Sequence, residues 1–191
     1  MGRNIDDLKK LALFKRQTFH RTVATEVYQT DEGALSLAKL HDNYHDMELA
    51  LLVDPKTRKV VDVAARMNRY PFETCVHALD TYRRLVGLDL TMGGILHRVH
   101  QLIPRADGCT HLYTMLEACL RALFIGAGYE ELKGRTTSDS RSDSQERLRE
   151  HPMTRDTCVS FRVDGKFPEA PETFLARLRE KDQPVPMSRE D

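Results

Sequence analysis

The chain has 191 residues, enough for one domain with a hydrophobic core, and its 29 lysines and arginines balance 29 aspartates and glutamates, so no basic excess favours nucleic-acid binding. No apolar run approaches the ~20 residues of a membrane span, and the N-terminal MGRNIDDLKK lacks the apolar core of a signal peptide. We therefore expect a soluble, cytoplasmic protein that binds neither nucleic acid nor membrane.

The first third of the chain predicts an arm followed by consecutive strands. Residues 1–16 are polar and indicate a short helix or an N-terminal arm. A first strand follows from Thr18, and turn residues at 31–33 separate it from a second strand with Leu35 and Leu37 on one face. The third strand alternates strictly, with Met47, Leu49, Leu51 and Val53 as its apolar residues. After a loop at 54–59, the alternation resumes at Val61, Val63 and Ala65, which predicts an antiparallel hairpin.

The hydrophobic spacing then changes from two residues to 3.6, which predicts three helices. The first begins near Pro71 and stops at Gly87, and its apolar stripe is Phe72, Cys75, Val76, Leu79, Tyr82 and Val86. The second is capped by Thr91 and ends at Pro104, and its stripe is Met92, Ile95, Leu96, Val99, Leu102 and Ile103. The third begins near Cys109 and ends at Gly126 or Gly128, and its stripe is Leu112, Met115, Leu116, Cys119, Leu120 and Leu123.

Strands followed by helices are typical of an α+β fold. We expect an antiparallel sheet of three to five strands, three helices packed on one face, and a flexible C-terminal tail. The predicted divisions are an arm at 1–16, an α+β domain at 17–132, a flexible linker at 133–155, and a tail at 156–191 with one short strand at 157–163. The linker prediction comes from the serine-rich, charged run KGRTTSDSRSDSQERLRE, which cannot bury enough apolar area to order itself.

The four cysteines differ in their predicted surroundings. Because no export signal is present, reduced thiols are expected in place of disulfides. Cys119 lies in the middle of an apolar stripe and is expected to fill the core, and Cys158 falls in the tail strand. Cys109 lies at a helix start, where free backbone N–H groups and the helix dipole lower a thiol pKa. Cys109 is therefore the cysteine best suited to chemistry, with His111 two residues later.

A metal site is predicted if three segments meet at one end of the sheet. The stretch HDNYHDM at 41–47 places two histidines and two aspartates before the third strand. Imidazole, carboxylate and thiolate are the usual ligands of zinc and iron. The predicted metal ligands are Cys75, Cys109, His45, His111 and Asp46, and zinc, iron or an iron–sulfur cluster would suit them. The alternatives are that both cysteines pack in the hydrophobic core, and that the turn at 41–47 is exposed to solvent and binds no metal.

Several segments resemble a bacterial family of unknown function, DUF2889. They are HRT near the start, YHDMELALLVD, PFETC, LVGLDLTMGG, DTCVSFRVDGKFP and, most specifically, DGCTHL, scattered over residues 17–170. This resemblance implies a shared fold but no particular activity.

A second resemblance is to iron–sulfur scaffold proteins of the NifU/IscU type. It rests on the order of a ligand-bearing turn, a Met-x-Leu strand, a hairpin, a middle cysteine and a cysteine at a late helix start. It implies that His45-Asp46, Cys75 and Gly108-Cys109 take the scaffold's ligand positions. The chain departs from that pattern, because the first scaffold cysteine, expected around Asn43, is missing and Gly108 replaces a histidine.

Three functions stay open from the residues alone. The first is a metal- or iron–sulfur-binding protein. The second is a small enzyme of bacterial metabolism, with Cys109 as nucleophile and His111 or His45 as base, or with a metal held there that activates water or substrate. The third is a non-catalytic protein that docks on a partner through its helical face, or that forms a homo-oligomer. No complete catalytic motif is present, so metal binding is the principal prediction.

Overall fold

A computed structural model of the protein describes residues 3–133 and, further along, residues 146, 149–150, 163–164, 170, 173–174 and 177. The chain divides into two units, residues 1–134 and 135–191, and every element below belongs to the first unit. The predicted linker and terminal strand, including Cys158, lie almost entirely outside the described residues. Within the described part of the chain, no helix has the length and apolar character needed to cross a membrane.

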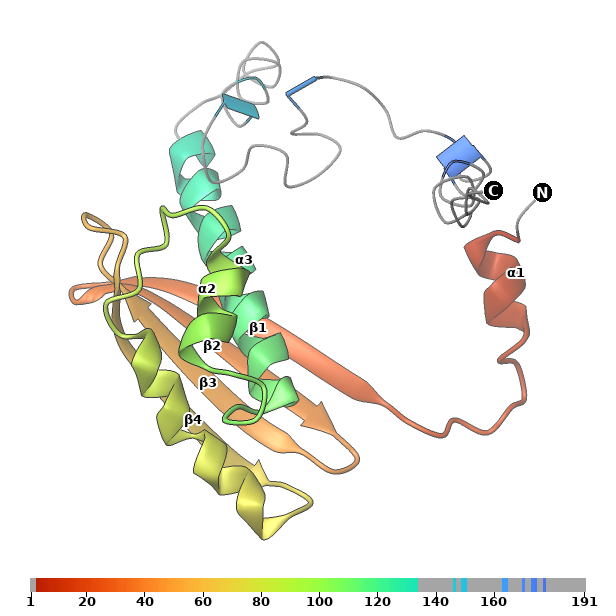
Figure 1. Ribbon diagram of the computed structural model, residues 1–191. Coiled ribbons are helices and arrows are strands. Elements are labelled where there is room, and N and C mark those ends of the chain that lie inside the picture. The colour runs from red at the N-terminus through yellow and green to blue at the C-terminus, as the bar shows by residue number, and fades with distance from the viewer. Residues whose placement is uncertain are drawn as a thin grey trace, which may run out of the picture. The chain divides into compact units, whose positions relative to one another are not determined.

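The first unit is built on a four-stranded antiparallel sheet with the strand order β1-β2-β3-β4 (Figure 1). The polar helix α1 (Ile5–Lys10) buries none of its residues. The strands β1 (Arg21–Thr30), β2 (Gly33–Asp42), β3 (Asp46–Val53) and β4 (Val60–Arg69) follow in order, each paired with the next. The predicted run of consecutive antiparallel strands is confirmed.

The covered face of the sheet matches the prediction in β3 but not in β2. All four predicted apolar residues of β3 are buried. In β2, the predicted face of Leu35 and Leu37 is not the covered one, because the buried alternate positions are Ser36, Ala38, Leu40 and Asp42. A helix passes close to the small Ser36, whose hydroxyl donates a hydrogen bond to the Cys119 carbonyl at 3.3 Å.

A register irregularity changes which residue of β4 points inward. The pairing between β3 and β4 shifts between Leu52 and Val53, so that Val53 lies opposite Val60. Val60 is therefore buried and Val61 is 46% exposed, contrary to the predicted alternation from Val61. Beyond the irregularity the prediction holds, and Val63 is buried.

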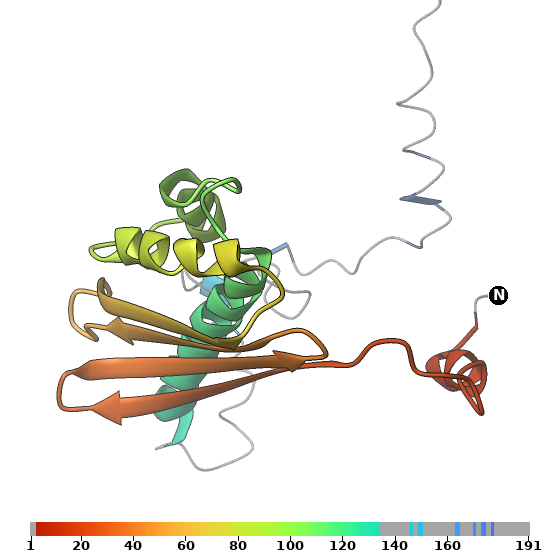
Figure 2. The same cartoon turned by 90° about the horizontal axis from the view of Figure 1, so that it is seen from below.

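The helices cover one face of this sheet and complete an α+β fold, as predicted. The 3₁₀ helices η1 (Glu73–Ala78) and η2 (Asp80–Leu85) lie between the sheet and α2 (Ile95–Leu102) (Figure 2). Of these, η2 packs on β4, and the long helix α3 (Thr110–Lys133) packs across β1, β2 and β3. The core fills the space between these two layers, with Tyr82, Val99, Leu112 and Met115 fully buried.

The first predicted helix is wrong in type. Its hydrogen bonds span three residues, as in Cys75 N–H to the Phe72 carbonyl at 3.0 Å and Leu79 N–H to the Val76 carbonyl at 3.1 Å. The tighter winding of a 3₁₀ helix rotates the apolar stripe. Phe72 lies before this helix as its extended N-cap residue and is 70% exposed, outside the predicted stripe.

The other two helices agree with the prediction except at their ends. Thr91 does not cap α2, because its N–H and hydroxyl both bond the Asp89 carboxylate and Gly94 is the N-cap residue. Helix α3 starts as predicted, and all six predicted stripe residues are buried. It does not stop at Gly126, where a Cβ would lie 3.4 Å from Val27 of β1. That glycine therefore lies inside the helix, facing β1, and does not end it.

Candidate metal centre

The site begins in the tight turn that joins β2 to β3. The Asp42 N–H donates to the His45 carbonyl at 2.9 Å, which closes the turn. The Asp42 carboxylate accepts the backbone N–H groups of Tyr44 at 2.7 Å and His45 at 2.8 Å. An aspartate that bonds the backbone two and three residues later is a common way to stabilise a turn. These bonds direct the carboxylate inward, and Asp42 is only 2% exposed.

Two arginines hold this turn in place. Arg21 of β1 lies opposite Asp42 in the strand register, and its Nε and Nη2 donate to Asp42 Oδ2 at 2.8 and 2.6 Å. Arg69, the last residue of β4, donates from Nη2 to the Asp42 carbonyl at 2.6 Å. Burial alone raises the pKa of Asp42, but the bonds from Tyr44, Arg21 and His45 outweigh it and hold this pKa well below the usual range. The carboxylate is therefore ionised.

The ionised carboxylate determines how His45 presents its ring. His45 Nδ1 lies 3.0 Å from Asp42 Oδ1, and the histidine is 8% exposed. Since an ionised carboxylate only accepts hydrogen bonds, this contact assigns the proton to Nδ1. The lone pair of a neutral His45 ring is then on Nε2, on the far side of the ring from Asp42.

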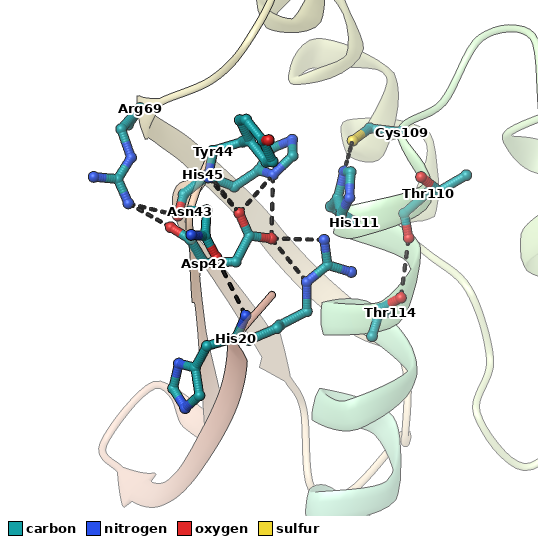
Figure 3. Close-up of polar contacts among 11 residues, drawn as sticks. His20, Asp42, Asn43, Tyr44, His45, Arg69, Cys109, Thr110, His111 and Thr114 are labelled. Atoms are coloured by element: carbon teal, nitrogen blue, oxygen red, sulfur yellow. Dashed lines mark hydrogen bonds and ion pairs between the residues drawn. The ribbon is translucent and has the colours of Figure 1, made fainter. Parts of the chain in front are cut away.

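His111 approaches His45 from the first turn of α3, as Figure 3 shows. The two ring centroids are 3.9 Å apart with an interplanar angle of 37°. His111 Nδ1 lies 3.7 Å from the Cys109 sulfur. Burial lowers the pKa of His111, and the charges of His45 and Arg21 lower it further. At neutral pH His111 is therefore an uncharged imidazole, the form that binds metals.

Potential ligand atoms of Asp42, His45 and His111 all lie within 4.8 Å of one another. They do not have equal capacity to bind an ion, because the Asp42 carboxylate already accepts bonds from two backbone N–H groups, Arg21 and His45. Asp42 is better suited to orient His45 than to ligate. In many metal sites, a carboxylate accepts a hydrogen bond from a histidine that ligates the metal ion.

Cys109 and Cys75 lie beside this cluster. Both thiols are half-buried and free, and with His45 and His111 they line one open cavity of about 730 Å³. The Tyr82 hydroxyl donates to the Cys109 carbonyl at 3.0 Å and thereby ties the start of α3 to η2. Burial raises the pKa of Tyr82 and keeps this donor protonated. The buried Cys119, by contrast, lies in the core cluster.

Four of the five predicted ligands thus line one cavity, and Asp46 does not. Asp46 begins β3 and lies opposite His41 in the sheet. Sequence reasoning missed Asp42 and Arg21. The signal for Asp42 was its place in Asp-Asn-Tyr-His, since an aspartate before asparagine favours a turn in which its side chain bonds the backbone. Arg21 is distant in sequence and could be found only from the strand register.

Comparison with known proteins gives one match. A family model described as a protein of unknown function (DUF2889) matches residues 24–124. No curated protein and no solved structure matches the chain, so the comparisons lend no support to the resemblance to iron–sulfur scaffold proteins. The matched range runs from β1 into α3 and contains Asp42, His45, Cys75, Cys109 and His111.

Proposed function

The chain belongs to the DUF2889 family of proteins of unknown function, and we propose that it binds a transition-metal ion, preferably zinc, through His45 and His111. The observation that carries the proposal is the approach of these two histidines and Asp42 to within 4.8 Å, with their ligand atoms converging from different elements. Zinc–nitrogen bonds are about 2.0–2.1 Å long, so zinc binding would draw these ligand atoms closer together.

Cys109 supplies the third ligand in this proposal. Its sulfur already lies 3.7 Å from His111 Nδ1, on the cavity side of the cluster. Cys75 lines the same cavity and is available as a fourth ligand. If Cys75 does not bind the ion, the fourth coordination position is left to water or a bound molecule. Asp46 is left out of the set, because the buried Asp42 supplies the carboxylate that supports His45.

The donor set favours zinc over an iron–sulfur cluster. Clusters are usually held by four cysteine thiolates, whereas this cavity offers two cysteines and three histidines, His45, His77 and His111. Two nitrogens with one or two sulfurs are a usual set for tetrahedral zinc. A reducing, cytoplasmic environment, which we also propose for this protein, would keep both thiols available.

Zinc titration by calorimetry tests the proposal, together with elemental analysis of the full chain purified without chelator. His45→Ala and His111→Ala should each lower zinc affinity at least about tenfold, since each removes a direct ligand. His97→Ala is the matched control, because His97 is an exposed histidine on α2. Zinc binding that is equally tight in all three variants would refute the site.

A second function is favoured by the contact between Cys109 and His111. A thiol within reach of an imidazole, facing a cavity, is the arrangement of a cysteine nucleophile and its base. In that case metal-free Cys109 would react with iodoacetamide at a rate that depends on His111. In the metal site, added zinc would instead protect Cys109, so alkylation with and without zinc distinguishes the two functions.

A further inference from the structure

Strand β1 is one edge of the sheet, and among the described residues no other strand pairs with its free side. Short length, proline, lysine and bulges are the usual features that stop an edge strand from pairing with another chain. β1 has none of them: it is ten residues long, contains neither proline nor lysine, and pairs with β2 without a bulge. The opposite edge strand, β4, is better protected, because its pairing shifts twice and Val60 bonds the backbone of Gly87 and Leu88.

The backbone groups that point to this free side belong to the odd-numbered residues of β1. The Asp42 N–H bonds the His45 carbonyl across the β2–β3 turn, so the even-numbered residues of β2 bond β3. Because the direction of hydrogen bonding alternates along a strand, the odd-numbered residues of β2 bond β1, and their partners in β1 are even-numbered. The residues with N–H and carbonyl groups that point away from the sheet are therefore Arg21, Val23, Thr25, Val27 and Gln29.

Apolar side chains on this edge are incompletely covered. Val23 and Val27 lie on the face that α3 covers, yet they are 38% and 37% exposed. Helix α3 reaches the edge at Gly126, which faces Val27, and ends only at Lys133. Ile125, beside that glycine, is 73% exposed. Both the strand and the helix thus present apolar surface at an edge that nothing else in the described part of the chain covers.

We propose that β1 pairs in antiparallel orientation with β1 of a second copy of the chain, about a twofold axis at Thr25, so that two four-stranded sheets join into one. Residues directly opposite each other in such a pair lie on the same face, so odd-numbered residues must pair with odd-numbered ones. Two twofold registers then use nearly the whole strand, one centred on Thr25 and one on Glu26. The second places two glutamates directly opposite each other, which is destabilising.

The register centred on Thr25 has favourable neighbours. It places Val23 opposite Val27 of the second copy, and Ala24 opposite Glu26 of the second copy, with no like charges directly opposed. The two half-exposed valines of each copy would then cover each other on one face of the joined sheet.

The two copies of α3 fit this arrangement. The first turn of α3 lies beside the turn at Asp42, which pairs with Arg21 at the start of β1, and Gly126 lies at Val27 near its end. Helix α3 therefore runs in the same direction as β1, and the twofold axis sets the two helices antiparallel on one face. Val27 of each copy marks where its helix reaches the joint. Since Val27 lies opposite Val23, these two points are about 13 Å apart along the strands, which leaves room for helices packed at about 8–10 Å.

Sedimentation velocity of the full chain over a dilution series tests the proposal, and a species of twice the chain mass of 21.9 kDa is expected. Ala24→Glu should raise the dissociation constant of the dimer at least about tenfold, because it opposes Glu26 of the second copy at two symmetric places. Ala24→Lys should keep the dimer. Folding cannot explain this difference, since Ala24 lies opposite Lys39 in its own sheet, where glutamate is the more favourable residue. Ala64→Glu, at an exposed position on β4, is the matched control and should leave the dimer unchanged.

Two further measurements fix the register. Glu26→Lys added to Ala24→Glu should restore the dimer, because the opposed charges then attract. In hydrogen exchange, the amides of Val23, Thr25 and Val27 should exchange slowly in the dimer and faster on dilution, whereas even-numbered amides of β1 stay slow throughout. A chain that is monomeric at every concentration, or a dimer equally tight in Ala24→Glu, would overturn the proposal. Odd-numbered amides that stay protected in the monomer would overturn it too, since another segment would then occupy the edge.

Discussion

Replacing Asp42 by asparagine should weaken both the fold and the metal site, by amounts that the surrounding bonds determine. The asparagine oxygen can still accept the N–H groups of Tyr44 and His45, which keeps the turn. Its NH₂ group would face the donors of Arg21, so the buried ion pair is lost. Removing one partner of a buried pair costs roughly 3–5 kcal/mol, and because Arg21 is 30% exposed we expect about 3 kcal/mol.

The assay is urea unfolding in the presence of chelator, followed by a separate zinc titration. Loss of the carboxylate behind His45 should lower zinc affinity about 10- to 100-fold. Asp46→Asn is the matched control and should change neither quantity by much, since Asp46 is only half-buried and outside the cluster. In a double-mutant cycle, Arg21→Gln combined with Asp42→Asn should destabilise less than the sum of the single changes.

The effect of Asp42 should also depend on pH in a defined direction. Its folded-state pKa lies well below the ordinary value of 3.8, so its stabilisation is complete above that value. The difference in unfolding free energy between wild type and Asp42→Asn should be constant above about pH 5 and shrink as the pH falls below 3.8. A difference under about 1 kcal/mol at pH 7, or one that grows in acid, would refute the account of Asp42 as an ionised, paired carboxylate.

Three further predictions concern the start of α3 and its core stripe. Gly108→Ala should destabilise the fold by about 1–2 kcal/mol in urea unfolding, because the new Cβ would lie 2.9 Å from a buried methyl group, whereas Gly93→Ala meets nothing within 4 Å and should be near neutral. Tyr82→Phe should cost about 1 kcal/mol by removing the bond to the Cys109 carbonyl, and an unchanged unfolding midpoint would contradict that bond. In peptide mapping after brief alkylation of metal-free protein, Cys109 should be labelled well before Cys119, whose thiol pKa is raised by burial; the reverse order would contradict the placement of α3.

The fold was predictable wherever one residue pattern dominated. Strict alternation in β3 and the 3.6-residue stripe of α3 each led to the right buried set, because one face of each element is covered along its length. In β2 the apolar pattern pointed to Leu35 and Leu37, but close approach of α3 requires small residues on the covered face, and Ser36 and Ala38 meet that need. Residue periodicity carries no information on how closely another element approaches.

The candidate site was predictable in its residue types and less so in its roles. His45, Cys109 and His111 stand out because metal-binding side chains lie beside a turn or a helix start. The turn signal at Asp42 does not say which way its side chain points, so the sequence alone did not decide between Asp42 and Asp46 as the buried carboxylate. The structure separates them by register: Asp42 faces inward opposite Arg21, and Asp46 lies on the other face.

The residues of the cluster come from parts of the chain that differ widely in sequence separation. Asp42 and His45 belong to the β2–β3 hairpin and lie three residues apart, whereas His111 lies on α3, 66 residues after His45, and meets them only through the packing of α3 on the sheet. A chain cut after β4 would therefore carry half of the centre. If the site holds an ion as proposed, the ion joins α3 to the β2–β3 turn, so zinc should slow the undocking of α3 far more than the opening of the hairpin loop at 54–59.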